Sequence, residues 1–253
     1  MSTLLLALIS GGVIGLALGA LGGGGSVLAV PALIYLLGFT PVAATTASLV
    51  IVTATSLTAL YAHARDGNVR WRSGGLFAAA GLLPAALGGV VAADLPPALL
   101  TGAFAVIAAA ASLRMLRPSA AALDALPVRP GRAAGTGAGL GAVTGMLGVG
   151  GGFLAVPALV NVVGLRMRAA VGTSLLVISV NSLAALAART GAAEQLDWAV
   201  VAPFAGAAIL GAWDGKRLAA KVSGGALRQV FAYVLLAVAL FMLIDVLARL
   251  GPS

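Results

Sequence analysis

The stretch Gly22-Gly-Gly-Gly-Ser-Val-Leu-Ala-Val-Pro31-Ala-Leu33 recurs 126 positions later as Gly148-Val-Gly-Gly-Gly-Phe-Leu-Ala-Val-Pro157-Ala-Leu159. The register extends beyond this block, because four further residues meet identical residues at the same offset: Gly15 with Gly141, Gly38 with Gly164, Ser48 with Ser174, and Ser56 with Ser182. The chain therefore consists of two copies of one unit, residues 1–113 and 132–253. A segment rich in proline and charge, residues 114–131, links them.

The composition predicts an all-α integral membrane protein. The chain has 253 residues, 61% hydrophobic and 9% charged, with a mean hydropathy of +1.11. Soluble domains carry about 25% charged residues, which cover their surface. Six apolar runs approach or exceed the roughly 18–20 residues that cross a bilayer of about 30 Å: Leu4–Leu21, Ala43–Ala62, Gly74–Ala93, Pro97–Leu113, Ala169–Ala188 and Leu227–Leu247.

The glycine run predicts a helical hairpin at the start of each copy. Leu4–Gly38 is uncharged and too long for one crossing at 1.5 Å per residue. Gly22–Gly25 divides it into Leu4–Leu21 and a shorter Val27–Leu37, so we expect the chain to enter and return. Three helices follow, which gives five segments per copy. An odd number places the second copy upside down in the membrane, as two inverted-topology repeats.

Loop charge provides a test of this arrangement. With the hairpins, thirteen of the fifteen Lys and Arg residues fall on one side and only Arg189 and Arg249 on the other. If each hairpin were a single crossing, the basic residues would divide almost evenly. The positive-inside rule therefore favours the hairpins, with the basic side cytoplasmic and both termini outside. The abundance of Ala, Gly and Arg is typical of a bacterial protein.

The two glycine runs are the strongest candidates for a functional site. Backbone groups exposed by consecutive glycines cannot be satisfied by lipid, so they must line a polar cavity or be buried in protein. A short helix follows each run, and its N-terminal N–H groups suit an anion. The site residues predicted on this basis are Gly22, Gly23, Gly24, Gly25, Ser26, Gly148, Gly150, Gly151 and Gly152.

Packing is the alternative interpretation for glycine, and we favour it for the glycines spaced four apart. Gly11, Gly15 and Gly19, with Gly137, Gly141 and Gly145, form the close-contact face typical of membrane helices. Such a face serves a contact within the chain or a homodimer. Pro31 and Pro157 are interpreted either as helix kinks or starts, or as parts of a mobile gate.

Polar side chains on the following helices are the next candidates. Ser48, Thr173, Ser174 and Asn181 could donate hydrogen bonds to an oxyanion, although membrane Ser and Thr more often bond to their own helix or a neighbour. His63 is the single histidine. It is a candidate for relaying a proton, and we favour the alternative of a solvated histidine at a helix end.

Several classes of function are excluded by the sequence. The chain has no cysteine, no metal-ligand cluster and no Walker sequence, so we expect no cofactor, no metal and no enzyme activity. The spacing gives no support to a serine–histidine intramembrane protease. The net charge of +8 sits in short loop clusters without interleaved aromatic residues, which argues against nucleic acid.

The repeated block and its companions resemble the TauE/SafE family of sulfite and organosulfonate exporter-like membrane proteins. The companions are Ala-Val-Gly-Thr-Ser-Leu at 170–175 and His63-x-Arg-x-Gly67-Asn-Val-x-Trp71. The resemblance covers about Leu4 to Val246. The chain departs from the family pattern at Thr45-Thr-Ala-Ser48 and at Arg70, where an acidic residue is usual. The resemblance implies a bacterial inner-membrane permease for small sulfur oxyanions or sulfonates.

These observations together lead to one functional hypothesis. The chain is a secondary transporter that exports a small anion by rocking of its two inverted halves around the glycine-rich tips. The expected partners are the anion and the lipid bilayer. The alternatives are a proton-coupled importer of an organic anion and a membrane scaffold that transports nothing.

Overall fold

The computed structural model describes residues 2–92, 97–117, 130–147, 152–187 and 196–250, which are helical and include no strand. The helices are α1 (Ser2–Leu21), α2 (Ser26–Tyr35), α3 (Pro41–Arg65), α4 (Trp71–Ala92), α5 (Pro97–Leu116), α6 (Pro130–Leu147), α7 (Gly152–Asn161), α8 (Met167–Ala187), α9 (Trp198–Lys221) and α10 (Gly224–Leu250). Five of them, α1, α3, α8, α9 and α10, are long and apolar enough to cross a membrane. The prediction of an all-α membrane protein is confirmed.

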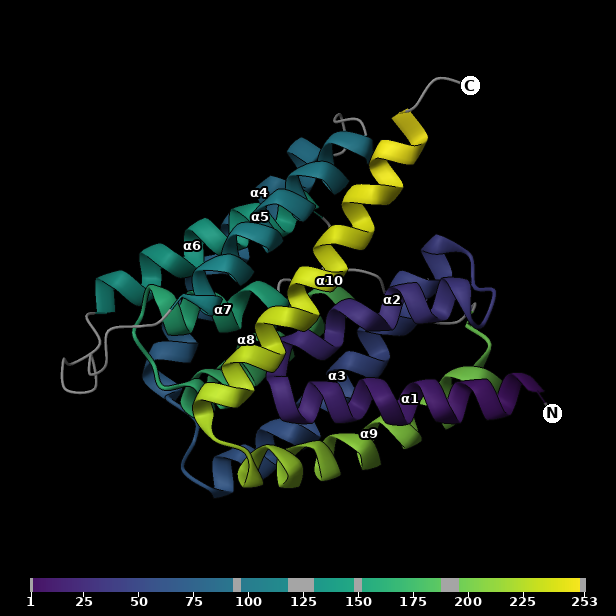
Figure 1. The fold of residues 1–253 in the computed structure, drawn as a ribbon, viewed down its shortest axis with the longest axis horizontal. Helices are drawn as coiled ribbons and strands as arrows, with labels where there is room; N and C mark the ends of the chain where they lie inside the picture. The colour runs from purple at the N-terminus through teal and green to yellow at the C-terminus, as the bar shows by residue number, and fades with distance from the viewer. Residues whose placement is uncertain (1, 93–96, 118–129, 148–151, 188–195, 251–253) are drawn as a thin grey trace.

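The chain reverses at the first glycine run, as predicted. Gly22–Gly25 form a single 3-10 turn (η1), and Gly22 has a φ of 67°, which an L side chain rarely adopts. After the turn α2 runs back towards the end of the bundle at which α1 begins (Figure 1). Because α2 and α7 each have 10 residues, each is about 15 Å long, half the thickness of a bilayer core.

The two short helices end in the same cap. Gly38 after α2 and Gly164 after α7 both have positive φ, 71° and 80°. The N–H of Phe39 bonds to the Leu33 carbonyl at 3.0 Å, and the N–H of Leu165 bonds to the Leu159 carbonyl at 2.9 Å. This is the glycine cap of a helix C-terminus, in which the following N–H groups satisfy the last carbonyls. The sequence repeat therefore extends to local backbone structure.

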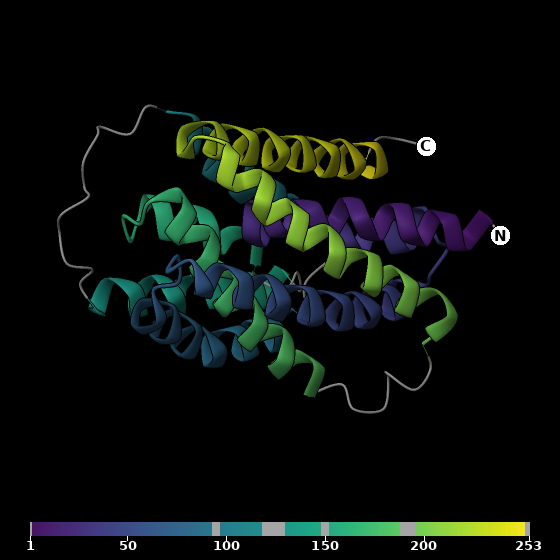
Figure 2. The same cartoon turned by 90° about the horizontal axis from the view of Figure 1, so that it is seen from below.

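Glycine lets α1 and α9 pack with their backbones in contact (Figure 1, Figure 2). A methyl group added at Gly15 would overlap the carbonyl of Ala208, and one added at Gly19 would overlap the carbonyl of Ala212. On the facing helix, Gly215 meets the carbonyl of Leu16 in the same way. Small residues at such a crossing allow close van der Waals packing, which holds membrane helices together in place of the hydrophobic effect.

The same contact occurs a second time, between α4 and α6. A methyl group at Gly137 would overlap the carbonyl of Phe77, and one at Gly141 would overlap the carbonyl of Gly81. The packing interpretation of the four-spaced glycines is confirmed for Gly11, Gly15, Gly19, Gly137 and Gly141, while Gly145 is not among the residues with a described environment. These glycine faces make contacts within the chain. The expectation of a homodimer stays a prediction.

Helices of each sequence half pack on helices of the other half. The first helix of each half packs on the fourth helix of the other half, α1 on α9 and α6 on α4. α3 and α8 also pack together, as do α5 and α10. α1 and α6 run in opposite directions through the bundle (Figure 1). The halves are therefore interlocked, and neither forms a separately packed body.

The outer face of the bundle is apolar. Leu83, Leu210 and Ile244 are 76%, 70% and 65% exposed, and many other large hydrophobic side chains are also uncovered. A water-soluble monomer rarely exposes contiguous apolar patches beyond a few hundred Å². This surface faces lipid.

We predict that Gly15→Ala destabilises the protein whereas Gly12→Ala on the same helix does not. The added methyl group at Gly15 overlaps the backbone of α9, so α1 and α9 must move apart to accommodate it. We expect this to lower the free energy of unfolding by about 1–3 kcal/mol. A methyl at Gly12 meets nothing within 4 Å. Thermal unfolding of the purified protein in detergent measures the difference. Gly141→Ala and Gly139→Ala form the matched pair on α6, and equal unfolding temperatures within each pair would contradict the packing account.

Candidate functional site

The first glycine turn lies against the second half of the chain. Gly22 and Gly23 are buried, and a Cβ at Gly22 would lie 2.5 Å from the Ser174 hydroxyl and 3.1 Å from the Val171 carbonyl. Gly22 thus reaches the first turns of α8. The structure brings together two residues that the sequence proposed independently, one from each half.

The start of α7 also meets this turn. η1 packs against α7 and α8, and α2 begins directly after η1 at Ser26. The N-terminus of α2 therefore begins where η1 meets α7, and the N–H groups at the start of a helix carry a partial positive charge. Of the second glycine run, Gly152 is the first residue of α7, while Gly148, Gly150 and Gly151 lie outside the described residues.

The predicted hydroxyl donors are bonded to their own helices. The Ser48 hydroxyl donates to the Thr45 carbonyl at 2.8 Å, and the Ser174 hydroxyl donates to the Val171 carbonyl at the same distance. A serine has one proton to donate, so each hydroxyl must rotate before it can donate to a ligand. Asn181 differs, because its buried side-chain oxygen has no partner among the described residues.

Thr173 has a structural role that the sequence did not reveal. Its fully buried hydroxyl accepts the backbone N–H of Arg70 at 3.0 Å, across the boundary between the two halves. Beside it, a Cβ at Gly172 would lie 2.6 Å from the Asn68 carbonyl. The loop between α3 and α4 therefore rests on the start of α8, fixed through Thr173.

The crossing of α3 and α8 is more polar than its neighbours. The hydroxyls of Ser56 and Ser179 lie 3.0 Å apart, one from each half. Nearby on α3, the buried hydroxyl of Thr53 has no partner in the described part of the chain. Buried polar atoms are nearly always hydrogen-bonded. Thr53 and Asn181 are therefore free to bind water or a ligand at this crossing.

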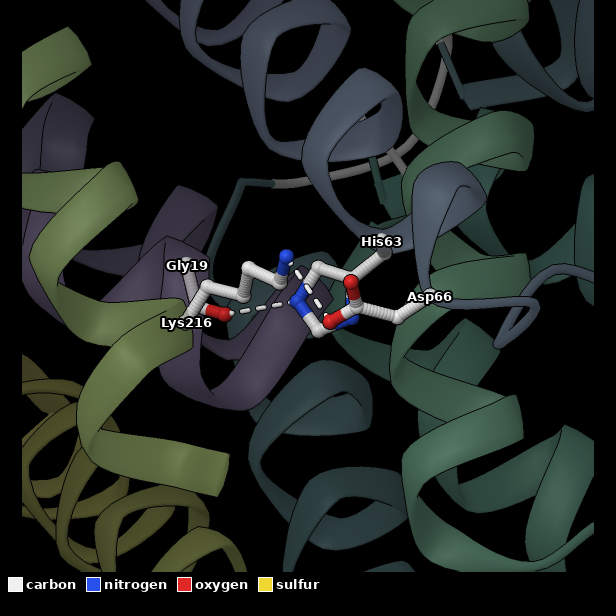
Figure 3. Close-up of polar contacts among 4 residues, drawn as sticks. All are labelled: Gly19, His63, Asp66 and Lys216. Atoms are coloured by element: carbon white, nitrogen blue, oxygen red, sulfur yellow. Dashed lines mark hydrogen bonds and ion pairs between the residues drawn. The ribbon is translucent and has the colours of Figure 1, made fainter. Parts of the chain in front are cut away.

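His63 is not solvated, and this expectation was wrong. The side chain is 4% exposed, and its Nε2 lies 3.1 Å from the Gly19 carbonyl (Figure 3). Since a carbonyl can only accept, Nε2 carries the proton. Gly19 lies in the last turn of α1, where backbone carbonyls commonly accept hydrogen bonds from outside the helix. His63 therefore caps α1.

Pro31 and Pro157 are each the sixth residue of their short helix, α2 and α7. They therefore do not begin these helices. A proline at this position removes one backbone donor and leaves a carbonyl of the first turn without its helical partner. Their role in a gate stays a prediction.

The site includes charged residues that were predicted only as cytoplasmic loop charges. Lys216 of α9 forms an ion pair with Asp66 at 2.8 Å, and both lie beside His63 (Figure 3). Arg168 donates to the carbonyls of Ala220 and Val222 at 3.0 and 3.1 Å, at the end of α9. The neighbours of Lys216 could not be identified without the fold.

The long apolar helices and the lipid-facing surface define a multi-pass helical membrane protein, and comparison with known proteins identifies its kind. The family profile for "Sulfite exporter TauE/SafE" matches residues 7–242. Two proteins called "Probable membrane transporter protein" from Xylella fastidiosa are similar, with 95% of both chains covered in each case. They are 35% identical over 249 residues (strain 9a5c) and 36% identical over 250 residues (strain Temecula1 / ATCC 700964). No solved structure matches the chain. The chain belongs to the TauE/SafE family and is a membrane transporter.

We predict that Thr173→Val destabilises the protein and that Thr173→Ser does not. Valine has nearly the shape of threonine but leaves the Arg70 N–H without its acceptor, which costs about 1–3 kcal/mol for a buried group. Serine keeps the oxygen. The measurement is thermal unfolding in detergent, and an unfolding temperature for the valine variant equal to that of the wild type would show that the bond across the halves is dispensable.

Proposed function

We propose that the protein exports a small anion, a sulfur oxyanion or an organosulfonate, as a secondary transporter of a bacterial inner membrane. The observation that carries the proposal is the contact of Gly22 with Ser174, at the point where η1 meets α7 and α8. The glycine break of one half, a helix N-terminus and a hydroxyl of the other half converge there. A break of this kind between repeats is where secondary transporters bind their substrates.

An anion is the substrate class that this chemistry favours. The helix N-termini that follow the glycine runs offer N–H groups, and Ser174 offers a hydroxyl beside Gly22. Donors of this kind hold a small oxyanion without the desolvation cost of a buried basic side chain. The name of the family, a sulfite exporter family, supports sulfur oxyanions within this class.

The direction follows from charge. Contacts among α3, α5, α8, α9 and α10 gather basic residues at one end of the bundle, as in the Lys216–Asp66 pair and the bond from Arg228 to the Arg117 carbonyl. With this end cytoplasmic, both termini are outside. An inside-negative potential pushes an anion outward by about 2.3 kcal/mol per charge per 100 mV. Export therefore needs no coupling ion.

We propose that the moving bodies are not the two sequence halves. Rocking of one half against the other would separate α1 from α9 and α4 from α6, the two pairs whose backbones touch through glycine. Movement that keeps these pairs intact must occur elsewhere. The α3–α8 crossing is such a place, because it holds the polar pair Ser56–Ser179 and two unpartnered buried atoms. We therefore place the conformational change between bodies that each contain helices of both halves.

We predict that Ser174→Ala lowers sulfite flux about tenfold or more, with the fold intact. A hydrogen bond to a charged substrate contributes about 1.5–3 kcal/mol, whereas the present bond to Val171 lies within one helix and is expendable. The assay is sulfite efflux from liposomes under an imposed inside-negative potential. Thr58→Val is the control, because that hydroxyl also bonds to its own helix, at 2.8 Å to the Ala54 carbonyl.

Three outcomes would contradict the proposal. Unchanged flux in Ser174→Ala would remove the contact of Gly22 and Ser174 from the substrate path. Electroneutral uptake that ignores the imposed potential would instead favour the proton-coupled importer. Absence of flux for sulfite, thiosulfate and methanesulfonate in the wild type would favour a scaffold.

A further inference from the structure

A polar cavity of about 230 Å³ opens at the basic end of the bundle. Its polar lining consists of five side chains, and they come from α3, the loop after it, α8 and α9: His63, Asp66, Asn68, Arg168 and Lys216. At about 30 Å³ for each water of the liquid, the cavity has room for a small oxyanion together with several waters. None of these side chains was among the predicted site residues except His63.

The cavity contains more positive than negative charge. Lys216 and Arg168 contribute two cations, and Asp66 contributes one carboxylate. Lys216 is paired with Asp66 at 2.8 Å. Arg168 uses Nη2 for the carbonyls at the end of α9 and forms no ion pair with a carboxylate among the described residues, which leaves the rest of its guanidinium able to bind an anion.

The Lys216–Asp66 pair is poorly placed to stabilise the fold. The side chain of Lys216 is 18% exposed and that of Asp66 is 46% exposed, so Asp66 sits at the wet rim. Ion pairs with a solvated partner contribute little to stability and are screened by salt. The carboxylate of Asp66 therefore binds the ammonium group of Lys216 weakly, and an anion that enters the cavity can displace this carboxylate.

His63 provides the cavity with an unused polar atom. Its Nε2 is committed to the Gly19 carbonyl, while its Nδ1 is buried and has no partner among the described residues. An imidazole fixed through one nitrogen presents the other in a defined direction. His63 therefore lines the cavity as a positioned polar group (Figure 3).

The cavity shares walls with the glycine turn. Ala20, two residues before Gly22, lines it, and so does Val171, whose carbonyl would lie 3.1 Å from a Cβ at Gly22. One wall residue thus contacts both the cavity and the candidate substrate site. An anion in the cavity is next to that site, on the side of the basic loops.

We propose that this cavity is an entry site that binds a small oxyanion between Lys216 and Arg168, with Asp66 as the resident competitor that the anion displaces. Its description as an entry site rests on the proposed function, whereas the binding itself does not. Asp66 belongs to the first half of the chain and Lys216 to the second, so the arriving anion also breaks an ion pair that joins the halves.

The test uses two substitutions that break the same ion pair from opposite sides. Sulfite is titrated calorimetrically, without oxygen, into the purified full-length protein in detergent. Lys216→Gln should weaken sulfite binding about tenfold, because the anion loses a cation. Asp66→Asn should tighten binding several-fold, because the lysine loses its competitor. Effects of opposite sign are expected if the anion binds beside this pair and takes the place of Asp66 on Lys216, whereas a purely structural ion pair would give effects of the same sign.

Lys221→Gln is the matched control, since it removes the same charge from the same helix end outside the cavity lining. Three results would overturn the proposal: equal weakening by Lys216→Gln and Asp66→Asn, no effect of either, or weakening by Lys221→Gln as large as that by Lys216→Gln. Thermal unfolding checks that each variant is folded.

Repeating the titrations in the Ser174→Ala background separates this proposal from the proposed function. Opposite effects of Lys216→Gln and Asp66→Asn in that background establish the cavity even if no flux is ever found. If Ser174→Ala alone abolishes all sulfite binding, the single site is the one at Gly22, and the cavity proposal fails while the proposed function stands.

Discussion

The fold depends on backbone contact between helices at positions without side chains. Lipid tails are as apolar as the side chains that face them, so contact between two apolar side chains gains little free energy over contact with lipid. Close packing and polar contacts must therefore hold membrane helices together. Gly15 against Ala208 and Gly141 against Gly81 provide that packing. The contact also brings Gly19 within reach of His63, and it places the turn at Gly22 beside α8. The candidate site is therefore positioned by the same glycine face that assembles the bundle.

Much of this arrangement could be predicted from sequence, because membrane length and glycine spacing are strong constraints. The break at Gly22–Gly25 and the packing face through Gly15 follow from local pattern and repeat symmetry, whereas the contact of Gly22 with Ser174, which were separate candidates, appears only in the fold. His63 was misjudged because it lies in the last turn of its helix, directly before a charged loop. Its burial comes from α1, which is distant in the chain and reaches His63 only through the fold.

The charged cavity was not predictable for a related reason. Lys216 and Asp66 lie in different halves, and each, taken alone, is an ordinary charge near a helix end. The positive-inside rule uses the number of such residues on each side of the membrane, but it does not predict which residues they contact. Thr173 shows the same limit, since a buried hydroxyl suits either a ligand or a backbone group, and only the position of Arg70 decides between them.

The packing across the halves also bears on what either half could do alone. α1 contacts α9, and the equivalent helix α6 contacts α4, so the same kind of contact is made twice. Each half by itself would leave the glycine faces of its first and fourth helices uncovered, because the helices that cover them belong to the other half. The two halves are therefore partners in assembly, and each supplies the backbone surface on which the other completes its packing.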